Sequence, residues 1–207
     1  MSLLISMLLK KLIRYIPADK KNIIISGVST DSKKIKKNYI FFAIRGKKFN
    51  GEKFIKEAVN KGASVVVCSK SCKIRDINIL VIRTNKIRHL LSDVASKFYK
   101  LKPKNIIAVT GTNGKTSVSD LFYQILRINN IRVASMGTLG IKYNDKLIKT
   151  NLTSPDTITL HKNLNYLKNK KINNVIIEAS SHGLDQKRLH HINFKGEIGR
   201  ASCRERV

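Results

Sequence analysis

The residues Gly111 to Ser117 (GTNGKTS) carry the clearest chemistry in the sequence. They follow a continuous apolar run, Asn105 to Thr110, which is typical of a strand buried on both faces, and a helical apolar pattern comes next. Glycines let backbone amides approach a phosphate chain, and a helix N-terminus adds the positive end of its dipole. We therefore predict a nucleotide-triphosphate site made by Gly111, Thr112, Asn113, Gly114, Lys115, Thr116 and Ser117.

Within this loop, two side chains have expected roles of their own. Lys115 is placed to reach the β- and γ-phosphates, and the Thr116 hydroxyl is placed to ligate Mg²⁺. The usual spacing asks for a glycine five residues before Gly114, where this chain has Val109, so the loop is a shorter variant.

The sequence of the loop, VTGTNGKT from Val109 to Thr116, resembles the ATP site of the Mur ligase family. These enzymes add amino acids to the nucleotide-linked peptidoglycan precursor. The superfamily also contains folylpolyglutamate and cyanophycin synthetases. Other segments of the sequence are therefore needed to distinguish these classes of enzyme. The resemblance covers residues 1–196 and implies ATP and Mg²⁺ as cofactors.

A first such segment is Ser29 to Lys33 (STDSK), followed by Tyr39 to Ala43 (YIFFA) and Gly46. It is similar to the uridine-nucleotide domain of the family members that add the third amino acid. The likeness implies that the uridine diphosphate is contacted by Thr30, Ser32 and the loop residues Lys47, Lys48 and Phe49. Taken alone, Asp31 and Ser32 indicate an Asx-turn or a helix cap.

Two further segments resemble the same members of the family. Thr153 to Asp156 (TSPD) is similar to their Thr-Thr-Pro-Asp segment, which implies that Thr153 and Ser154 bind the muramoyl-dipeptide. The same residue types also suit a helix N-terminus. The run from Glu178 to Arg188 (EASSHGLDQKR) is the most specific of the segments. It implies a substrate-holding role for Ser180, Gln186 and Arg188, and leaves His182 as either a site residue or a structural histidine.

Glu178 is the second expected catalytic residue beside Lys115. It ends an apolar run, Asn174 to Ala179, that should form a strand next to the phosphate-loop strand. Its carboxylate would then project from the carboxyl edge of the sheet toward Mg²⁺. We therefore expect Thr116 and Glu178 to be the metal ligands.

The alternation of strand and helix patterns predicts an α/β fold in two parts. Residues 1–101 form a small α/β uridine-nucleotide domain, and residues 102–196 begin a mostly parallel-sheet ATP-binding domain that is truncated. Residues 197–207 (EIGRASCRERV) fit no expected element. They are similar to a translated sequencing adapter, which favours a non-native tail over an ordinary disordered terminus.

Charge and cysteine content bound the remaining possibilities. Lys and Arg number 41 against 13 Asp and Glu, which gives a net charge of +28. The lysines are dispersed among Ile and Asn, which favours a compositional bias over a nucleic-acid footprint. Cys68 and Cys72 are expected to be free thiols in a reducing compartment, and the apolar start of the chain is too short to span a membrane.

The family resemblance, taken with these features, implies a cytoplasmic, monomeric ATP-dependent ligase of peptidoglycan synthesis. It would join diaminopimelate or lysine to UDP-N-acetylmuramoyl-L-alanyl-D-glutamate through an acyl-phosphate, with no nucleic-acid partner and no membrane insertion. The 207-residue chain would be an inactive fragment by itself. The alternatives are a folylpolyglutamate or cyanophycin synthetase, and a basic phosphate-loop protein that binds nucleic acid.

Overall fold

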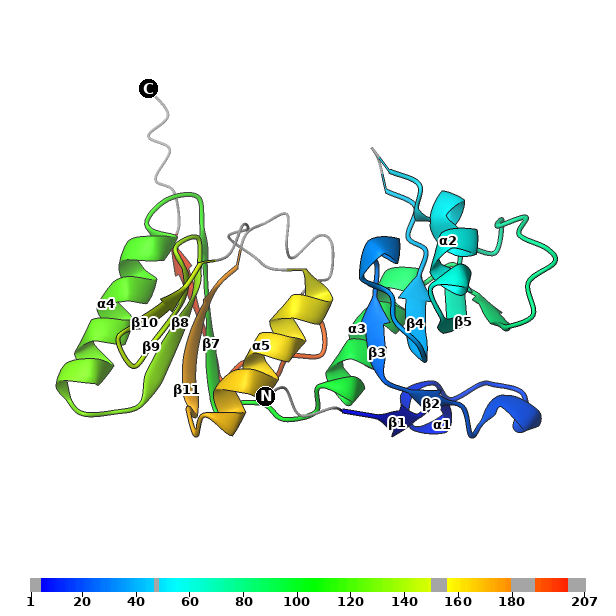
Figure 1. Cartoon of the computed structure of the whole chain (residues 1–207). Helices are drawn as coiled ribbons and strands as arrows, with labels where there is room; N and C mark the ends of the chain where they lie inside the picture. The colour runs from blue at the N-terminus through cyan, green and yellow to red at the C-terminus, as the bar shows by residue number, and fades with distance from the viewer. Residues whose placement is uncertain (1–4, 47–48, 150–155, 180–188, 201–207) are drawn as a thin grey trace, which may run out of the picture. The chain divides into compact units, whose positions relative to one another are not determined.

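The computed structural model describes residues 5–46, 49–149, 156–179 and 189–200. The chain divides into two compact units, Met1–Phe98 and Tyr99–Val207, close to the predicted boundary after residue 101 (Figure 1). Each unit has its own sheet and its own buried core. The predicted α/β fold class is confirmed.

The first unit is built on a four-stranded sheet in the order β3-β4-β5-β6, and every neighbouring pair is parallel. Its strands are β3 (Gly27–Ser29), β4 (Tyr39–Phe42), β5 (Ala63–Cys68) and β6 (Leu80–Arg83). The connections contain the short helices η2 (Ser32–Lys34) and η3 (Gly51–Phe54) together with α2 (Ile55–Asn60), and α3 (Ile87–Phe98) follows the last strand. Because the strands are parallel, the loops that follow them meet at one edge of the sheet.

The first described elements of the chain are short. Strand β1 (Met7–Leu8) pairs antiparallel with β2 (Ile24–Ile25), and only α1 (Leu9–Leu12) is helical, before the 3₁₀ turn η1 (Ala18–Lys20). Leu9 and Leu12 are still fully buried, so the apolar residues reach a core although the helix is a single turn.

The second unit has a six-stranded sheet in the order β10-β9-β8-β11-β7-β12. Four strands are parallel: β7 (Asn105–Gly111), β8 (Val133–Gly137), β11 (Asn174–Glu178) and β12 (Gly196–Arg200). The antiparallel part is the hairpin of β9 (Gly140–Tyr143) and β10 (Lys146–Ile148). Asn144 and Asp145 form its turn with φ angles of 43° and 60°, the positive values that a two-residue type I′ turn requires.

Two helices cover opposite faces of this sheet (Figure 1). α4 (Lys115–Ile128) leads from β7 to β8, and α5 (Thr157–Asn169) leads from the hairpin to β11. Alternate residues of the parallel strands pack against α5 in one core, which contains Ile106, Ala108, Ala134, Met136, Val175, Ile177, Leu160, Leu164 and Leu167. This packing fixes the sheet that carries the phosphate loop.

One expectation about the end of the chain is wrong. Gly196–Arg200 form β12, which pairs with β7 from Ile107 to Gly111, although residues 197–207 suggested no element. The pairing covers the edge of β7 that would otherwise be open, so β11 and β7 both lie inside the sheet. The residues after Arg200 lie outside the described part of the chain.

Candidate nucleotide-triphosphate site

The phosphate loop connects the end of β7 to the start of α4, as its sequence predicts. Gly114 occupies the N-cap position with φ 76°, in the left-handed region that glycine adopts without strain. Its carbonyl accepts the first helical hydrogen bond, from the Val118 amide at 3.0 Å. The loop therefore turns abruptly into the helix and leaves the amides of the first helical turn directed out of the N-terminus.

The Lys115 side chain folds back over the same loop. Its Nζ donates to the carbonyl oxygen of Gly111 at 2.7 Å and to that of Thr112 at 3.1 Å. The ammonium group is thus held beside the strand-to-helix turn by two neutral acceptors. Phosphate oxygens at the helix N-terminus would be stronger acceptors for this charge.

Glu178 meets the phosphate loop from the neighbouring strand. β11 pairs in parallel with β7, and Glu178 lies opposite Val109 at the carboxyl end of both strands, which confirms the predicted arrangement of the two strands. The residue is 2% exposed, and its Oε2 accepts a hydrogen bond from the Thr116 hydroxyl at 3.1 Å. The two expected metal ligands are therefore brought together from positions 62 residues apart.

Two residues at this site were missed in the sequence. The Thr138 hydroxyl donates to the same Oε2 of Glu178 at 2.9 Å. Its neighbour Gly137 lies so close to the carboxylate that an added Cβ would come within 2.0 Å of Oε1. Gly137 ends β8 and Thr138 follows it, so both lie at the carboxyl edge where side chains of parallel strands gather, but no local pattern names Glu178 as their partner.

The donor set at this point fits Mg²⁺. Thr116 and Glu178 supply a hydroxyl and a carboxylate, and oxygen is the ligand that Mg²⁺ prefers. Among the described residues no group of three or more His, Cys, Asp or Glu side chains is arranged to hold a metal. Mg²⁺ is commonly bound by one or two protein groups with waters and substrate phosphates, so this sparse set is sufficient.

In the first unit, the predicted Thr30 to Ser32 segment follows β3. Thr30 is exposed, whereas Ser32 is buried and its hydroxyl donates to Glu57 Oε2 at 2.9 Å. Asp31 caps η2, because its Oδ1 accepts from the Lys33 amide at 2.9 Å. The Asx-type interpretation of Asp31 is thereby confirmed, and the contacts of Thr30 and Ser32 to a uridine nucleotide stay predictions.

Glu52 joins two loops at the same edge of this sheet. Its Oε2 accepts from Arg45 Nη2 at 2.7 Å, and its Oε1 accepts from the Ser69 hydroxyl at 2.5 Å and the Ser69 amide at 3.2 Å. Burial raises the pKa of Glu52, but the hydrogen bonds from Ser69 and Arg45 outweigh it, and the net pKa lies below the ordinary 4.5. Glu52 thus stays ionised and ties the loop after β4 to the end of β5.

Several predicted substrate-binding residues lie outside the described residues. These are Lys47 and Lys48, and the later residues Thr153, Ser154, Ser180, His182, Gln186 and Arg188. Their roles stay predictions.

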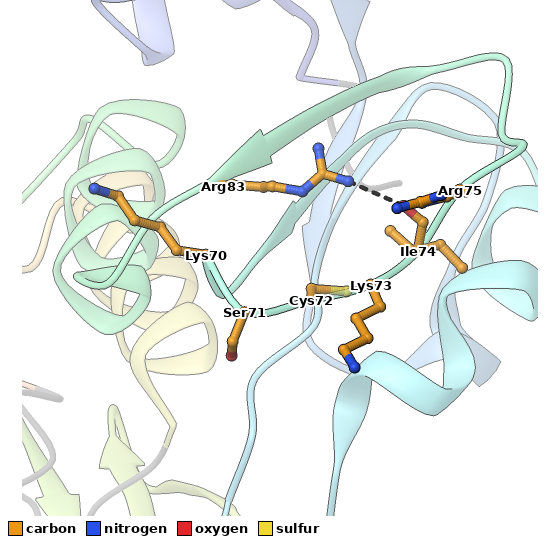
Figure 2. A pocket seen from close by; sticks show the side chains of 7 residues that line it. All are labelled: Lys70, Ser71, Cys72, Lys73, Ile74, Arg75 and Arg83. Carbon is orange, nitrogen blue, oxygen red and sulfur yellow. Dashed lines mark hydrogen bonds between the residues drawn. The ribbon is translucent and has the colours of Figure 1, made fainter.

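A cavity of about 560 Å³ opens in the first unit, beside the loop between β5 and β6. Lys70, Lys73, Arg75 and Arg83 contribute to its lining, and Arg83 Nη2 donates to the Ile74 carbonyl at 3.0 Å. Figure 2 shows Lys70 and Lys73 extending in different directions, so the cationic groups do not converge on one point. The cavity contains none of the predicted site residues.

Three titratable groups apart from the phosphate loop have shifted pKa values. Burial, followed by the neighbouring Cys72, raises the pKa of Cys68 to about 12, and both cysteines are free thiols as predicted. In the second unit, burial lowers the pKa of Lys102 to about 8. Burial and then the Lys102 charge lower the pKa of His161 to about 3. His161 is therefore neutral at pH 7.

Comparison with protein families matches both units. The Mur ligase family catalytic domain matches residues 24–99, and the Mur ligase middle domain matches residues 109–199. The second match begins at the phosphate-loop strand and ends inside β12, which places that strand within the family's pattern.

Two similar whole proteins share a name. The UDP-N-acetylmuramoyl-L-alanyl-D-glutamate--2,6-diaminopimelate ligase of Brucella melitensis is 35% identical over 178 residues, which are 86% of this chain and 36% of that enzyme. The enzyme of that name from Wigglesworthia glossinidia brevipalpis is 37% identical, over 91% of this chain and 40% of its own length. The chain therefore spans about two-fifths or less of the curated relatives it matches.

Solved structures agree in fold. A structure titled as a UDP-N-acetylmuramoyl-L-alanyl-D-glutamate--2,6-diaminopimelate ligase matches with a TM-score of 0.81 and 27% identity, over 94% of this chain and 40% of that one. The MurF ligase of Thermotoga maritima in complex with ADP shares the fold, with a TM-score of 0.52 and 21% identity over 78% of this chain and 34% of that one. With both family domains matched in order and the phosphate-loop strand in its expected place, the chain belongs to the Mur ligase family.

Proposed function

We propose that this chain is the nucleotide-binding part of an ATP-dependent ligase of peptidoglycan synthesis. The reaction joins 2,6-diaminopimelate to UDP-N-acetylmuramoyl-L-alanyl-D-glutamate. The observation that carries the proposal is the meeting of Thr116 and Glu178 at the mouth of the phosphate loop. The names of the similar enzymes support the choice of substrate and of amino acid, in favour of diaminopimelate over lysine.

The chemistry needs such a site because a carboxylate is a poor electrophile. Its negative charge repels an attacking amine, and it has no good leaving group. Bound Mg·ATP supplies a phosphoryl group for the D-glutamate side carboxylate, with release of ADP. The amine of the incoming amino acid then attacks the carbonyl carbon of this acyl-phosphate, and inorganic phosphate leaves with the former carboxylate oxygen. The new amide has lost one amine proton to a base.

The chain's own residues act on the phosphoryl group. Lys115 can turn its ammonium from the loop carbonyls to the phosphate oxygens, and the amides at the start of α4 donate to the same chain of phosphates. Thr116 and Glu178 would hold Mg²⁺ against those oxygens. Thr116, Glu178 and the helix amides are held in place before the reaction, which is the arrangement that makes electrostatic stabilisation effective.

The remaining binding roles follow the resemblance. The first unit would take the uridine diphosphate through Thr30 and Ser32. Thr153, Ser154, Ser180, Gln186 and Arg188 would hold the muramoyl-dipeptide, where the planar fork of an arginine suits a diphosphate or a carboxylate. We infer a monomer that works in the cytoplasm. Within the described part of the chain, every helix is too short or too polar to cross a membrane.

The test is an assay of ATP hydrolysis by the complete gene product, with UDP-N-acetylmuramoyl-L-alanyl-D-glutamate present. Phosphate release should require 2,6-diaminopimelate and should yield the UDP-linked tripeptide by mass spectrometry. The 207-residue chain alone should release almost no phosphate, since positioning supplies most of phosphoryl-transfer catalysis. Release that depends on glutamate and a folate, or tight salt-sensitive binding to DNA, would overturn the proposal.

A further inference from the structure

The carboxylate of Glu178 is held from two sides. Thr116, at the start of α4, and Thr138, in the turn after β8, both donate to Oε2, at 3.1 Å and 2.9 Å. Because β11 lies between β7 and β8, the two hydroxyls reach the same oxygen from the two neighbouring strand ends. A carboxylate oxygen has about two lone-pair sites, so these donors define the plane of the group.

Gly137 makes this arrangement possible. An added Cβ would come within 2.0 Å of Oε1, 2.2 Å of Cδ and 2.6 Å of Cγ of Glu178. Real Cβ atoms do not approach so closely, so the Glu178 side chain packs directly on the glycine backbone. The segment Gly137-Thr138 therefore provides both the space for the carboxylate and a hydroxyl that orients it.

We propose that Thr138 is a positioning residue for the metal site: its hydroxyl fixes the orientation of the Glu178 carboxylate, so that Glu178 and Thr116 are aligned before Mg²⁺ and nucleotide bind. This inference rests on the proposed function of the phosphate loop. Thr138 itself acts through Glu178, while Thr116 also has the metal as an expected partner. When the Thr116 oxygen ligates a cation, the Thr138 hydrogen bond continues to hold the carboxylate.

The Glu178 side chain is buried where the two hydroxyls meet it. Glu178 is 2% exposed, and a polar group buried to this extent needs hydrogen-bond partners to offset the loss of water. The Thr138 hydroxyl supplies one of them without adding a positive charge that would compete with the metal. Removing a hydrogen-bond partner of a metal-ligating side chain commonly changes metal affinity about 10–100-fold.

The experiment measures Mg²⁺-dependent binding of ADP to the complete gene product by calorimetry, with a Mn²⁺ titration followed by electron paramagnetic resonance. Thr138→Val keeps the shape and removes the hydroxyl, and Thr138→Ser restores it. Thr159→Val is the matched control, because the Thr159 hydroxyl also donates to a carboxylate, Asp156 Oδ2 at 2.6 Å, at the start of α5.

We expect Thr138→Val to raise the Mg²⁺ and Mn²⁺ concentrations for half-saturation about tenfold or more. Thr138→Ser should stay within about threefold of the wild type, because it keeps the hydrogen bond. Thr159→Val should bind both cations as the wild type does. Unchanged cation affinity in Thr138→Val, or an equal loss in Thr138→Ser or Thr159→Val, would overturn the positioning role alone. A wild-type protein that binds ADP without any dependence on Mg²⁺ would overturn the proposed function as well.

Discussion

The phosphate-loop corner of the second unit and the carboxyl edge of the first unit's sheet contain the same kinds of side chains but use them differently. At the phosphate-loop corner, which consists of Lys115, Thr116, Thr138 and Glu178, the hydroxyls of Thr116 and Thr138 both donate to the Glu178 carboxylate. This carboxylate lies beside the N-terminus of α4. At the edge of the first sheet, the hydroxyl of Ser32 is directed to Glu57, and that of Ser69 to Glu52.

The difference lies in what the hydrogen bonds connect. Glu52 joins the loop after β4 to the end of β5, and Ser32 joins η2 to α2, so these bonds hold one backbone segment against another. The bonds at Glu178 orient a functional group on strands that backbone pairing already fixes. We therefore expect mutations at the phosphate-loop corner to reduce catalysis with little loss of stability. Mutations at the carboxyl edge of the first sheet should reduce stability with less effect on catalysis.

The largest effect should come from Lys115→Ala in the complete gene product. Ligation should fall by about 10²–10³-fold or more, because removal of a preorganised group that faces developing charge has this cost. Binding of the uridine-linked substrate should stay within a few-fold, since the hydrogen bonds of the Lys115 ammonium among the described residues go to the phosphate loop. Phosphate release and substrate affinity are measured side by side. Near-normal turnover would break the assignment of this corner as the catalytic one.

Glu178→Gln should give the next largest effect. The amide keeps the shape of the carboxylate but loses the negative charge that attracts Mg²⁺. Activity should fall strongly and the Mg²⁺ concentration for half-maximal rate should rise, while the melting temperature changes little. A Mg²⁺ titration that superimposes on the wild type would show that Glu178 acts as an ordinary buried residue at a strand end.

The phosphate-loop corner was largely predictable from sequence because its parts are local. A buried strand, a glycine turn and a helix follow one another within residues 105–128, and backbone rules alone place the loop at the helix N-terminus. Glu178 was also predictable, since a second apolar run ends in an acid and parallel strands share one carboxyl edge. Thr138 was not, because nothing local to Gly137-Thr138 indicates that β11 will lie between β7 and β8.

The end of the chain shows another limit of local patterns. Residues 196–200 (GEIGR) have two glycines and little apolar periodicity, and glycine is poor in isolated strands. They are nevertheless a strand, because β7 presents a free row of backbone donors and acceptors that pairs with them. In the first unit, the residues around Asp31 were recognised as a turn, but the partner of Ser32 lies 25 residues away, beyond any local rule.

Glu52→Gln tests whether the hydrogen bonds at the edge of the first sheet are structural. Removing the charge weakens the bonds to Arg45 and Ser69 and should cost the first unit about 1.5–3 kcal/mol, the range for hydrogen bonds to charged groups. The folded pKa of Glu52 is lowered, so its contribution is complete above pH 4.5 and is lost as the pH falls through the folded-state pKa. Wild-type and variant stabilities should therefore differ at pH 7 and converge in acid.

The measurement is hydrogen exchange of peptides that cover β4 and β5, recorded from pH 7 downward. Asp19→Asn is the control, since it makes the same change in charge at an exposed pair with Lys20. Equal protection in Glu52→Gln and wild type at pH 7 would contradict the structural role. Neutralising an acid should by itself improve long-range attraction of an anionic substrate, so weaker uridine-substrate binding in Glu52→Gln alone would reflect loop displacement.

Ser32→Ala should have the smallest effect. It tests whether one residue can both hold the edge of the sheet and bind the substrate. A hydroxyl that donates to Glu57 still has lone pairs with which to accept a hydrogen bond from a ligand. If Ser32 also contacts the uridine nucleotide, its loss should weaken substrate binding about fivefold, since a neutral hydrogen bond is worth ~1 kcal/mol. Glu57→Gln separates the two roles, because it weakens the internal bond and leaves the Ser32 hydroxyl in place. Substrate affinity measured by calorimetry should fall in Ser32→Ala and stay near wild type in Glu57→Gln. If both variants lose the same affinity, Ser32 supports the edge only through its packing and hydrogen bond. The hydroxyls at the first edge would then be structural, and those at the phosphate-loop corner functional.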